Sequence, residues 1–90
     1  MTIARWDIEA VRAAFPALAI TDDGRPRVYL DAPGGSQVPA RVVERMGEVM
    51  LNSCANEGGA FRTSHDSDRI LAGAHAAAAA FLGAAPDEIV

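Results

Sequence analysis

Two glycines and a serine, Gly34-Gly35-Ser36, form the first passage with residue types suited to ligand binding. They follow a short run typical of a β-strand, Arg27–Asp31, and precede a segment of helical periodicity that begins at Pro39. Glycine lets a backbone approach a ligand closely, and the N-terminus of a helix attracts anions. The passage lacks the lysine and the glycine spacing of common phosphate-binding motifs, so a plain turn and a ligand-facing turn both remain open.

A second candidate site is the polar loop Asn56-Glu57-Gly58-Gly59-Ala60-Phe61-Arg62. Its arginine is the residue type that binds a carboxylate through two parallel hydrogen bonds. An arginine beside a flexible loop is also often a solvated or interface charge. From the local pattern alone we favour this second interpretation of Arg62.

Two further groups of reactive side chains have simpler explanations. His65, Asp66 and Asp68 resemble part of a metal site, yet such sites need three or four ligands in a defined geometry. Acidic residues are in any case favoured in the first turn of a helix. Cys54 is a potential nucleophile, but we expect a small packed residue near a helix end. We therefore predict neither a metal site nor a catalytic cysteine.

Three helices must position these residues. The hydrophobic periodicity predicts helices over residues 7–15, 39–52 and 63–82. Asp7 is the expected N-cap of the first helix, and the first four residues of the third match a capping box. Gly83 is a natural terminator of the third helix.

The remaining segments are expected to form short strands and turns. We predict a strand over residues 27–31, a type II turn centred on Pro33 and Gly34, and a turn at Thr21–Gly24. The last residues, Glu88–Val90, read as the opening of a further strand. One strand cannot form a sheet, so we expect other polypeptide to complete this structure.

The composition narrows the class of protein. Half of the 90 residues are apolar, which is typical of a globular chain, but only three Phe, one Trp and one Tyr are available to fill a core. We therefore expect the segment to pack against a partner surface. The net charge of −4 argues against nucleic-acid binding. All eight basic residues are arginine, so the chain contains no lysine.

Targeting signals and cysteine content give an expectation for the compartment. Met1–Trp6 lacks the apolar run of a secretory signal, and no segment reaches the roughly 20 apolar residues of a membrane span. The single cysteine forms no internal disulfide bond. These features favour a cytoplasmic protein without a membrane partner.

Four sequence motifs occur in an informative order. They are Val11-Arg12-Ala13-Ala14-Phe15-Pro16-Ala17-Leu18; Val28-Tyr29-Leu30-Asp31-Ala32-Pro33-Gly34-Gly35-Ser36-Gln37-Val38-Pro39; Asn56-Glu57-Gly58-Gly59-Ala60-Phe61-Arg62-Thr63-Ser64; and Phe81-Leu82-Gly83-Ala84 followed by Asp87-Glu88-Ile89-Val90. Together they resemble the start of a class V aminotransferase of the cysteine desulfurase-like type. The resemblance implies the N-terminal segment of an α/β enzyme that depends on pyridoxal 5'-phosphate and has fold type I, the aspartate aminotransferase-like fold. Within that fold, the 90 residues themselves are expected to be mostly α-helical, with one or two short strands.

The same resemblance implies a domain organisation and partners. Residues 1–55 would belong to the small domain, and residues 56–90 would be the loop and helix that lead into the large domain. The rest of the enzyme would lie beyond Val90. Members of this family are homodimers that act on amino acids.

The resemblance also implies roles for residues in both glycine-containing segments. The turn lies near the substrate side of the active site in relatives, and the loop approaches the active site or the dimer interface. The candidates for substrate binding are Gly34, Gly35, Ser36, Asn56, Gly58, Gly59 and Arg62. The cofactor is held through a Schiff-base lysine. Because this chain has no lysine, that residue is expected outside it, and the 90 residues alone are not expected to catalyse the reaction.

Several functions fit the sequence. In the better-known desulfurases the loop carries histidines, whereas this chain has Asn56 and Phe61. Desulfurase, selenocysteine lyase, epimerase and transaminase reactions therefore remain open. A non-catalytic truncated remnant would account for the missing lysine, and an unrelated small helical interaction domain would account for the alanine-rich helices.

Overall fold

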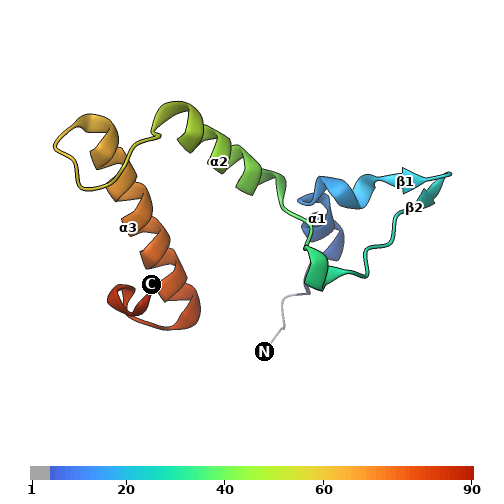
Figure 1. Cartoon of the computed structure of the whole chain (residues 1–90). Coiled ribbons are helices and arrows are strands. Elements are labelled where there is room, and N and C mark those ends of the chain that lie inside the picture. The colour runs from blue at the N-terminus through green and yellow to red at the C-terminus, as the bar shows by residue number, and fades with distance from the viewer. Residues whose placement is uncertain (1–4) are drawn as a thin grey trace. The chain divides into compact units, whose positions relative to one another are not determined.

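The computed structural model describes residues 5–90, and the chain divides into two compact units, Met1–Gly47 and Glu48–Val90. Most of the stretch Met1–Trp6, whose sequence differs from a secretory signal, lies outside the described residues. Helices dominate, as predicted, and one two-stranded sheet is present in the described part of the chain (Figure 1). No helix within residues 5–90 is long and apolar enough to cross a membrane.

The first helix, α1, spans Ile8–Ala13. The Asp7 carboxylate accepts a hydrogen bond from the Ala10 N–H at 3.0 Å, so the predicted N-cap is confirmed. The helix ends two residues earlier than predicted, because Phe15 is already extended before Pro16. Pro16 then opens the 3₁₀ turn η1, Pro16–Ala19.

A β-hairpin follows in the first unit. Strand β1, Thr21–Asp22, pairs antiparallel with β2, Arg25–Pro26, and Asp22 lies opposite Arg25. The two residues between the strands, Asp23 and Gly24, have φ of 50° and 77°, the signature of a tight two-residue hairpin turn. The turn predicted at Thr21–Gly24 is therefore confirmed.

An exposed ion pair closes the hairpin. The Arg27 guanidinium donates to both carboxylate oxygens of Asp22, at 2.8 and 2.6 Å. These hydrogen bonds lower the pKa of Asp22 and raise the pKa of Arg27. The pair fixes the point at which the chain leaves β2.

The strand predicted over residues 27–31 is wrong. The segment is not assigned to a strand, because no described strand lies beside it to complete a ladder. Its anchor is instead a side chain: the Tyr29 hydroxyl donates to the Ala17 carbonyl at 2.8 Å. The neighbouring Val28 and Leu30 are 73% and 90% exposed. The residue types in this segment indicated an extended backbone, but they could not show that no neighbouring strand pairs with it.

Helix α2 spans Ala40–Asn52, begins directly after Pro39 and ends where the periodicity predicted. The N–H of Ala40 donates to the Ala14 carbonyl at 3.0 Å, which ties the start of α2 to the end of α1 within the first unit. Helix α2 continues past Gly47 into the second unit.

Helix α3, Arg62–Leu82, is the longest element. Gly83 ends it in the left-handed conformation, with φ of 69°, as predicted. The predicted capping box is wrong: the helix starts one residue before Thr63, and Phe61 caps it without a side-chain hydrogen bond.

The chain then turns back beside the end of α3 through the 3₁₀ turn η3, Pro86–Glu88 (Figure 1). The Glu88 carboxylate accepts from the Ala85 N–H at 2.8 Å. Within the described residues, Glu88–Val90 is not part of a strand, so the predicted strand opening is not found.

Apolar side chains are mostly exposed. Among residues 5–90 the buried set consists of Ala79, Ser64 and Ser67. Many of the bulky apolar side chains are at least 55% exposed. They include Trp6, Val43, Met46, Met50, Leu51, Phe61, Phe81 and Leu82. The described residues therefore bury little of their apolar surface against one another, as the shortage of large side chains led us to expect.

We expect the 90-residue chain by itself to unfold gradually rather than in one cooperative step, because apolar burial is the main stabilising term and little is present. Calorimetry should show no sharp heat-absorption peak, and a hydrophobic dye should bind at low temperature. A sharp calorimetric transition with no dye binding would contradict this expectation.

Two glycine-to-alanine substitutions should change helicity in opposite directions. A Cβ added at Gly47, inside α2, meets no atom within 4 Å, so Gly47→Ala should favour the helix by about 1 kcal/mol. At Gly83 the positive φ opposes any side chain, so Gly83→Ala should disfavour the helix end by about 1 kcal/mol. Far-UV circular dichroism of both variants measures the helicity, and equal changes in the same direction would contradict the assignment.

Candidate functional site

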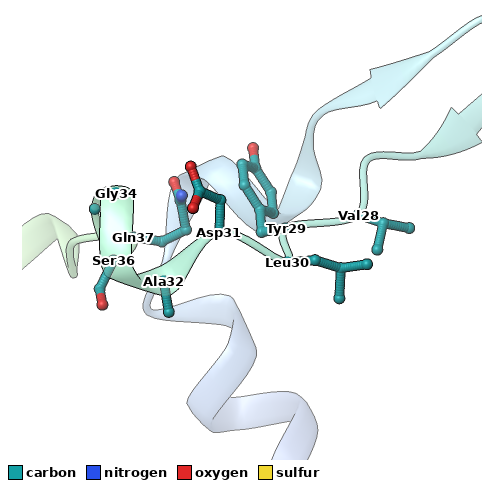
Figure 2. Close-up of a pocket in the computed structure, with 9 residues that line it drawn as sticks. Val28, Tyr29, Leu30, Asp31, Ala32, Gly34, Ser36 and Gln37 are labelled. Carbon is teal, nitrogen blue, oxygen red and sulfur yellow. The ribbon is translucent and has the colours of Figure 1, made fainter.

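The first candidate surface is a hollow of about 460 Å³ in the first unit. Figure 2 shows its lining, which runs from Val28 to the glycine turn and on to Gln37. Tyr29 and Asp31 point to one side of the extended segment, whereas Val28 and Leu30 point to the other, as expected from the alternation of side chains in extended backbone. The extended segment thus has a polar and an apolar side.

The glycine turn forms one end of this hollow. Ala32–Gly34 is a 3₁₀ turn, η2, and the residue with positive φ is Gly35, at 149°, rather than Gly34. The predicted type II turn is therefore wrong. The Gly35 N–H donates to the Ala32 carbonyl at 3.1 Å, as it would in a type II turn, but the Gly34 N–H also donates to the Asp31 carbonyl at 3.0 Å. Two such bonds in succession continue the turn as a 3₁₀ helix and keep Gly34 out of the positive φ region.

These hydrogen bonds limit what the turn can bind. The N–H groups of Gly34 and Gly35 are used inside the turn, and the first N–H of α2 is used by Ala14. A phosphate cradle built from these three N–H groups is therefore excluded in this conformation. The polar side chains that line the hollow are Tyr29, Asp31, Ser36 and Gln37. Only Ser36 of these four was a candidate from the sequence.

The second candidate surface is the loop before α3, which lies in the second unit and folds against the first turns of that helix (Figure 1). The Ser64 hydroxyl accepts from the Gly59 N–H at 2.6 Å and donates to the Asn56 carbonyl at 2.7 Å. The Asp68 carboxylate accepts from the Gly58 N–H at 2.9 Å. Three predicted site residues, Asn56, Gly58 and Gly59, are thus held by α3.

A second buried serine fixes the chain just before this loop. The Ser67 hydroxyl lies 2.7 Å from the Ala55 carbonyl and 3.2 Å from the Ser53 carbonyl. Ser64 is 0% exposed and Ser67 9% exposed, and both hydroxyls have partners. The spacing of Ser64, Ser67 and Asp68 is i, i+3, i+4, which places all three on one helix face. That spacing is the sequence signal that the capping-box interpretation overlooked.

The glycines of the loop have conformational roles. Gly58 has a φ of 78°, which favours glycine, and its N–H is bonded to Asp68. A Cβ at Gly59 would collide with the Phe61 ring and lie 2.9 Å from the Ser64 hydroxyl. Because both N–H groups are occupied, neither glycine offers its N–H to a ligand. The exposed polar side chains left in the loop are those of Asn56 and Glu57.

Arg62 begins α3 and forms an ion pair with Asp66, at 3.2 Å. Asp66 also pairs with Arg69 one turn further along the helix. The Arg62 side chain is 82% exposed, so its pairing leaves it on the surface. Its role in substrate binding stays a prediction.

The other candidate side chains are those of His65, Asp66, Asp68 and Cys54. Among residues 5–90 no group of three His, Cys, Asp or Glu side chains is arranged to hold a metal ion. Asp66 is engaged by arginines and Asp68 by the loop. Cys54 is exposed, so the prediction that it is packed is wrong. In the connection after α2, the neighbouring Ser53 and Ala55 are the residues held against α3 by Ser67, and Cys54 between them stays exposed.

Comparison with known proteins assigns the chain to a family. Residues 28–90 match the family described as Aminotransferase class-V. The chain is similar to the aminotransferase-like protein FGM3 of Gibberella zeae, with 34% identity over 94 residues that cover 100% of this chain and 22% of the relative. No solved structure matches it.

Two curated relatives are named as desulfurases. The cysteine desulfurase of Pectobacterium carotovorum is 36% identical over 87 residues, which cover 94% of this chain and 21% of the relative. The probable cysteine desulfurase of Aeropyrum pernix is also 36% identical over 87 residues, covering 96% of this chain and 20% of the relative. The chain thus spans about a fifth of the length of these relatives. It belongs to the class-V aminotransferase family.

Proposed function

We propose that this chain is the N-terminal part of a cysteine desulfurase-like enzyme that depends on pyridoxal 5'-phosphate and acts on an amino acid. The observation that carries the proposal is the similarity of 94% or more of the chain to relatives named as cysteine desulfurases. Family membership supports a cofactor-dependent enzyme of this class. The α/β fold type I of the complete protein, its homodimeric state and its cytoplasmic location are parts of the same proposal.

The residues of this chain do not fit the attachment site of the cofactor. Pyridoxal phosphate is held in such enzymes by an imine with a lysine side chain, and this chain contains no lysine. The two candidate surfaces offer carboxylate, hydroxyl, amide and guanidinium groups instead. The proposal therefore assigns these 90 residues to substrate binding and places cofactor attachment in another part of the complete protein.

Each surface offers groups suited to an amino-acid substrate. In the first unit, the Asp31 carboxylate and the side chains of Ser36 and Gln37 line one hollow. In the second unit, the Asn56 side chain and the Arg62 guanidinium are exposed. An arginine can pair with the substrate carboxylate, and an amide can both donate and accept hydrogen bonds. We treat the two surfaces as separate parts of the proposal.

The first experiment reads the codons after Val90 and measures the intact mass of the native product. A longer product is then purified, its visible absorbance is recorded, and sulfide release from cysteine is compared with turnover of other amino acids. We expect an absorbance band from protein-bound cofactor that disappears when borohydride reduces the imine. A product that ends at Val90, or a longer product without cofactor, would contradict the proposal and favour the non-catalytic remnant.

Replacing Arg62 tests its role in binding the substrate carboxylate. In the complete enzyme, Arg62→Gln should raise KM by about 10- to 100-fold, the range expected when a charge-assisted hydrogen bond is lost. Arg69→Gln is the matched control, because it also removes one arginine partner of Asp66. Equal increases in KM for both variants would assign the effect to the ion pair and contradict substrate binding by Arg62.

A further inference from the structure

The loop before α3 is unusual in this chain because it is held by buried groups. Ser64 and Ser67 are two of the buried side chains among residues 5–90, whereas most bulky apolar side chains are exposed and none is buried. Burial of a hydroxyl opposes folding unless the hydroxyl is hydrogen-bonded. Both serines meet this condition through the backbone of the preceding loop. Both buried hydroxyls among residues 5–90 therefore bond to the backbone that leads from α2 into α3.

Ser64 joins the two ends of that loop. It accepts from the Gly59 N–H and donates to the Asn56 carbonyl, so one oxygen atom closes a loop of four residues. The geometry leaves no room for a side chain at Gly59, where a Cβ would lie 2.9 Å from this oxygen. Ser67 and Asp68 hold Ala55 and Gly58, but neither bonds to Asn56.

The hydrogen bond from Ser64 holds the backbone of Asn56 in place. Its carbonyl is fixed from the helix side, while the residue as a whole is exposed. An ordered backbone that carries an exposed polar side chain is the arrangement expected of a binding group held in position before its ligand arrives.

We propose that Ser64 is a positioning residue for substrate binding, which acts by holding the backbone of Asn56 so that the Asn56 side chain contacts the amino-acid substrate. This inference rests on the proposed function, because it takes Asn56 as part of the substrate-binding surface. The inference adds Ser64, which does not itself contact the substrate, to the residues on which substrate binding depends. The role differs from simple stabilisation of the loop, because the effect of Ser64 on substrate binding passes through Asn56.

The test uses the complete cofactor-loaded enzyme with Ser64→Ala, Asn56→Ala and the double variant. Ser64→Ala should raise KM about tenfold with little change in kcat, the size expected when two hydrogen bonds of ordinary net strength are lost. Asn56→Ala should raise KM to a similar or greater extent. In the Asn56→Ala background, Ser64→Ala should produce almost no further increase, because the two residues act as a unit. Thr63→Ala, which removes the neighbouring exposed hydroxyl, is the control and should leave KM unchanged.

A second measurement is independent of turnover. Peptide-level hydrogen exchange over residues 53–60 should be faster in Ser64→Ala than in the wild type, and unchanged in Asn56→Ala and Thr63→Ala. Should Ser64→Ala fail to fold, Ser64→Cys keeps the side-chain size with weaker hydrogen bonding and should show a smaller change in the same direction.

The outcomes separate the two proposals. Multiplicative effects of Ser64→Ala and Asn56→Ala on KM in an active, cofactor-loaded enzyme would overturn the positioning role alone. Unchanged hydrogen exchange in Ser64→Ala would also overturn it. A wild-type protein without cofactor and without amino-acid turnover would overturn the proposed function and this inference with it.

Discussion

The hydroxyl of Ser64 accepts a hydrogen bond from Gly59 and donates one to Asn56, and this pair of bonds closes the loop that precedes α3. A serine at this position of a helix would ordinarily compete with the backbone of its own helix. Here α3 starts at Arg62 without a side-chain cap, which leaves the Ser64 hydroxyl available to the loop. The loop backbone is thus ordered mainly by these hydrogen bonds, with the Phe61 ring lying against Gly59. Hydrogen bonds from polar groups thus order the backbone of this loop, as apolar packing orders the chain in a larger core.

In contrast to the hydrogen-bonded serines, the large apolar side chains are mostly exposed. Leu51 is 85% exposed and Phe81 is 89% exposed, values typical of surfaces that other polypeptide covers. The chain spans about a fifth of the length of its curated relatives. The secondary structure of the 90 residues is therefore set locally, while their packing is not.

Local patterns predicted the helices well. The Asp7 cap, the end of α2 at Asn52 and the Gly83 terminator all depend on interactions within a few residues, and all three are found. Some of the predictions that failed depend on partners distant in sequence, whereas others failed for local reasons. A strand at residues 27–31 needs a neighbouring strand, which the local pattern cannot supply. The capping box failed locally, because α3 starts at Arg62, one residue before Thr63, and the Asp66 carboxylate pairs with Arg62 and Arg69.

The candidate site was predictable only in outline. The glycine turn and the loop were located from sequence, but the engagement of the Gly58 N–H by Asp68 was not, because ten residues separate them. The polar lining at Asp31 and Gln37 was likewise found only from the fold. Both residues stand in the motif of residues 28–39, but the sequence pattern pointed to its glycines and serine.

Gly34 and Gly59 both have close neighbours, but substitution by alanine should have different consequences at the two positions. At Gly34 the nearest atoms belong to the flexible end of the Asp31 side chain, which can rotate away. At Gly59 the Ser64 oxygen is fixed by two hydrogen bonds and has no freedom to move. Alanine should therefore be tolerated at position 34 during divergence. Position 59 should stay glycine for as long as position 61 stays phenylalanine and position 64 stays serine, so these three positions should change together.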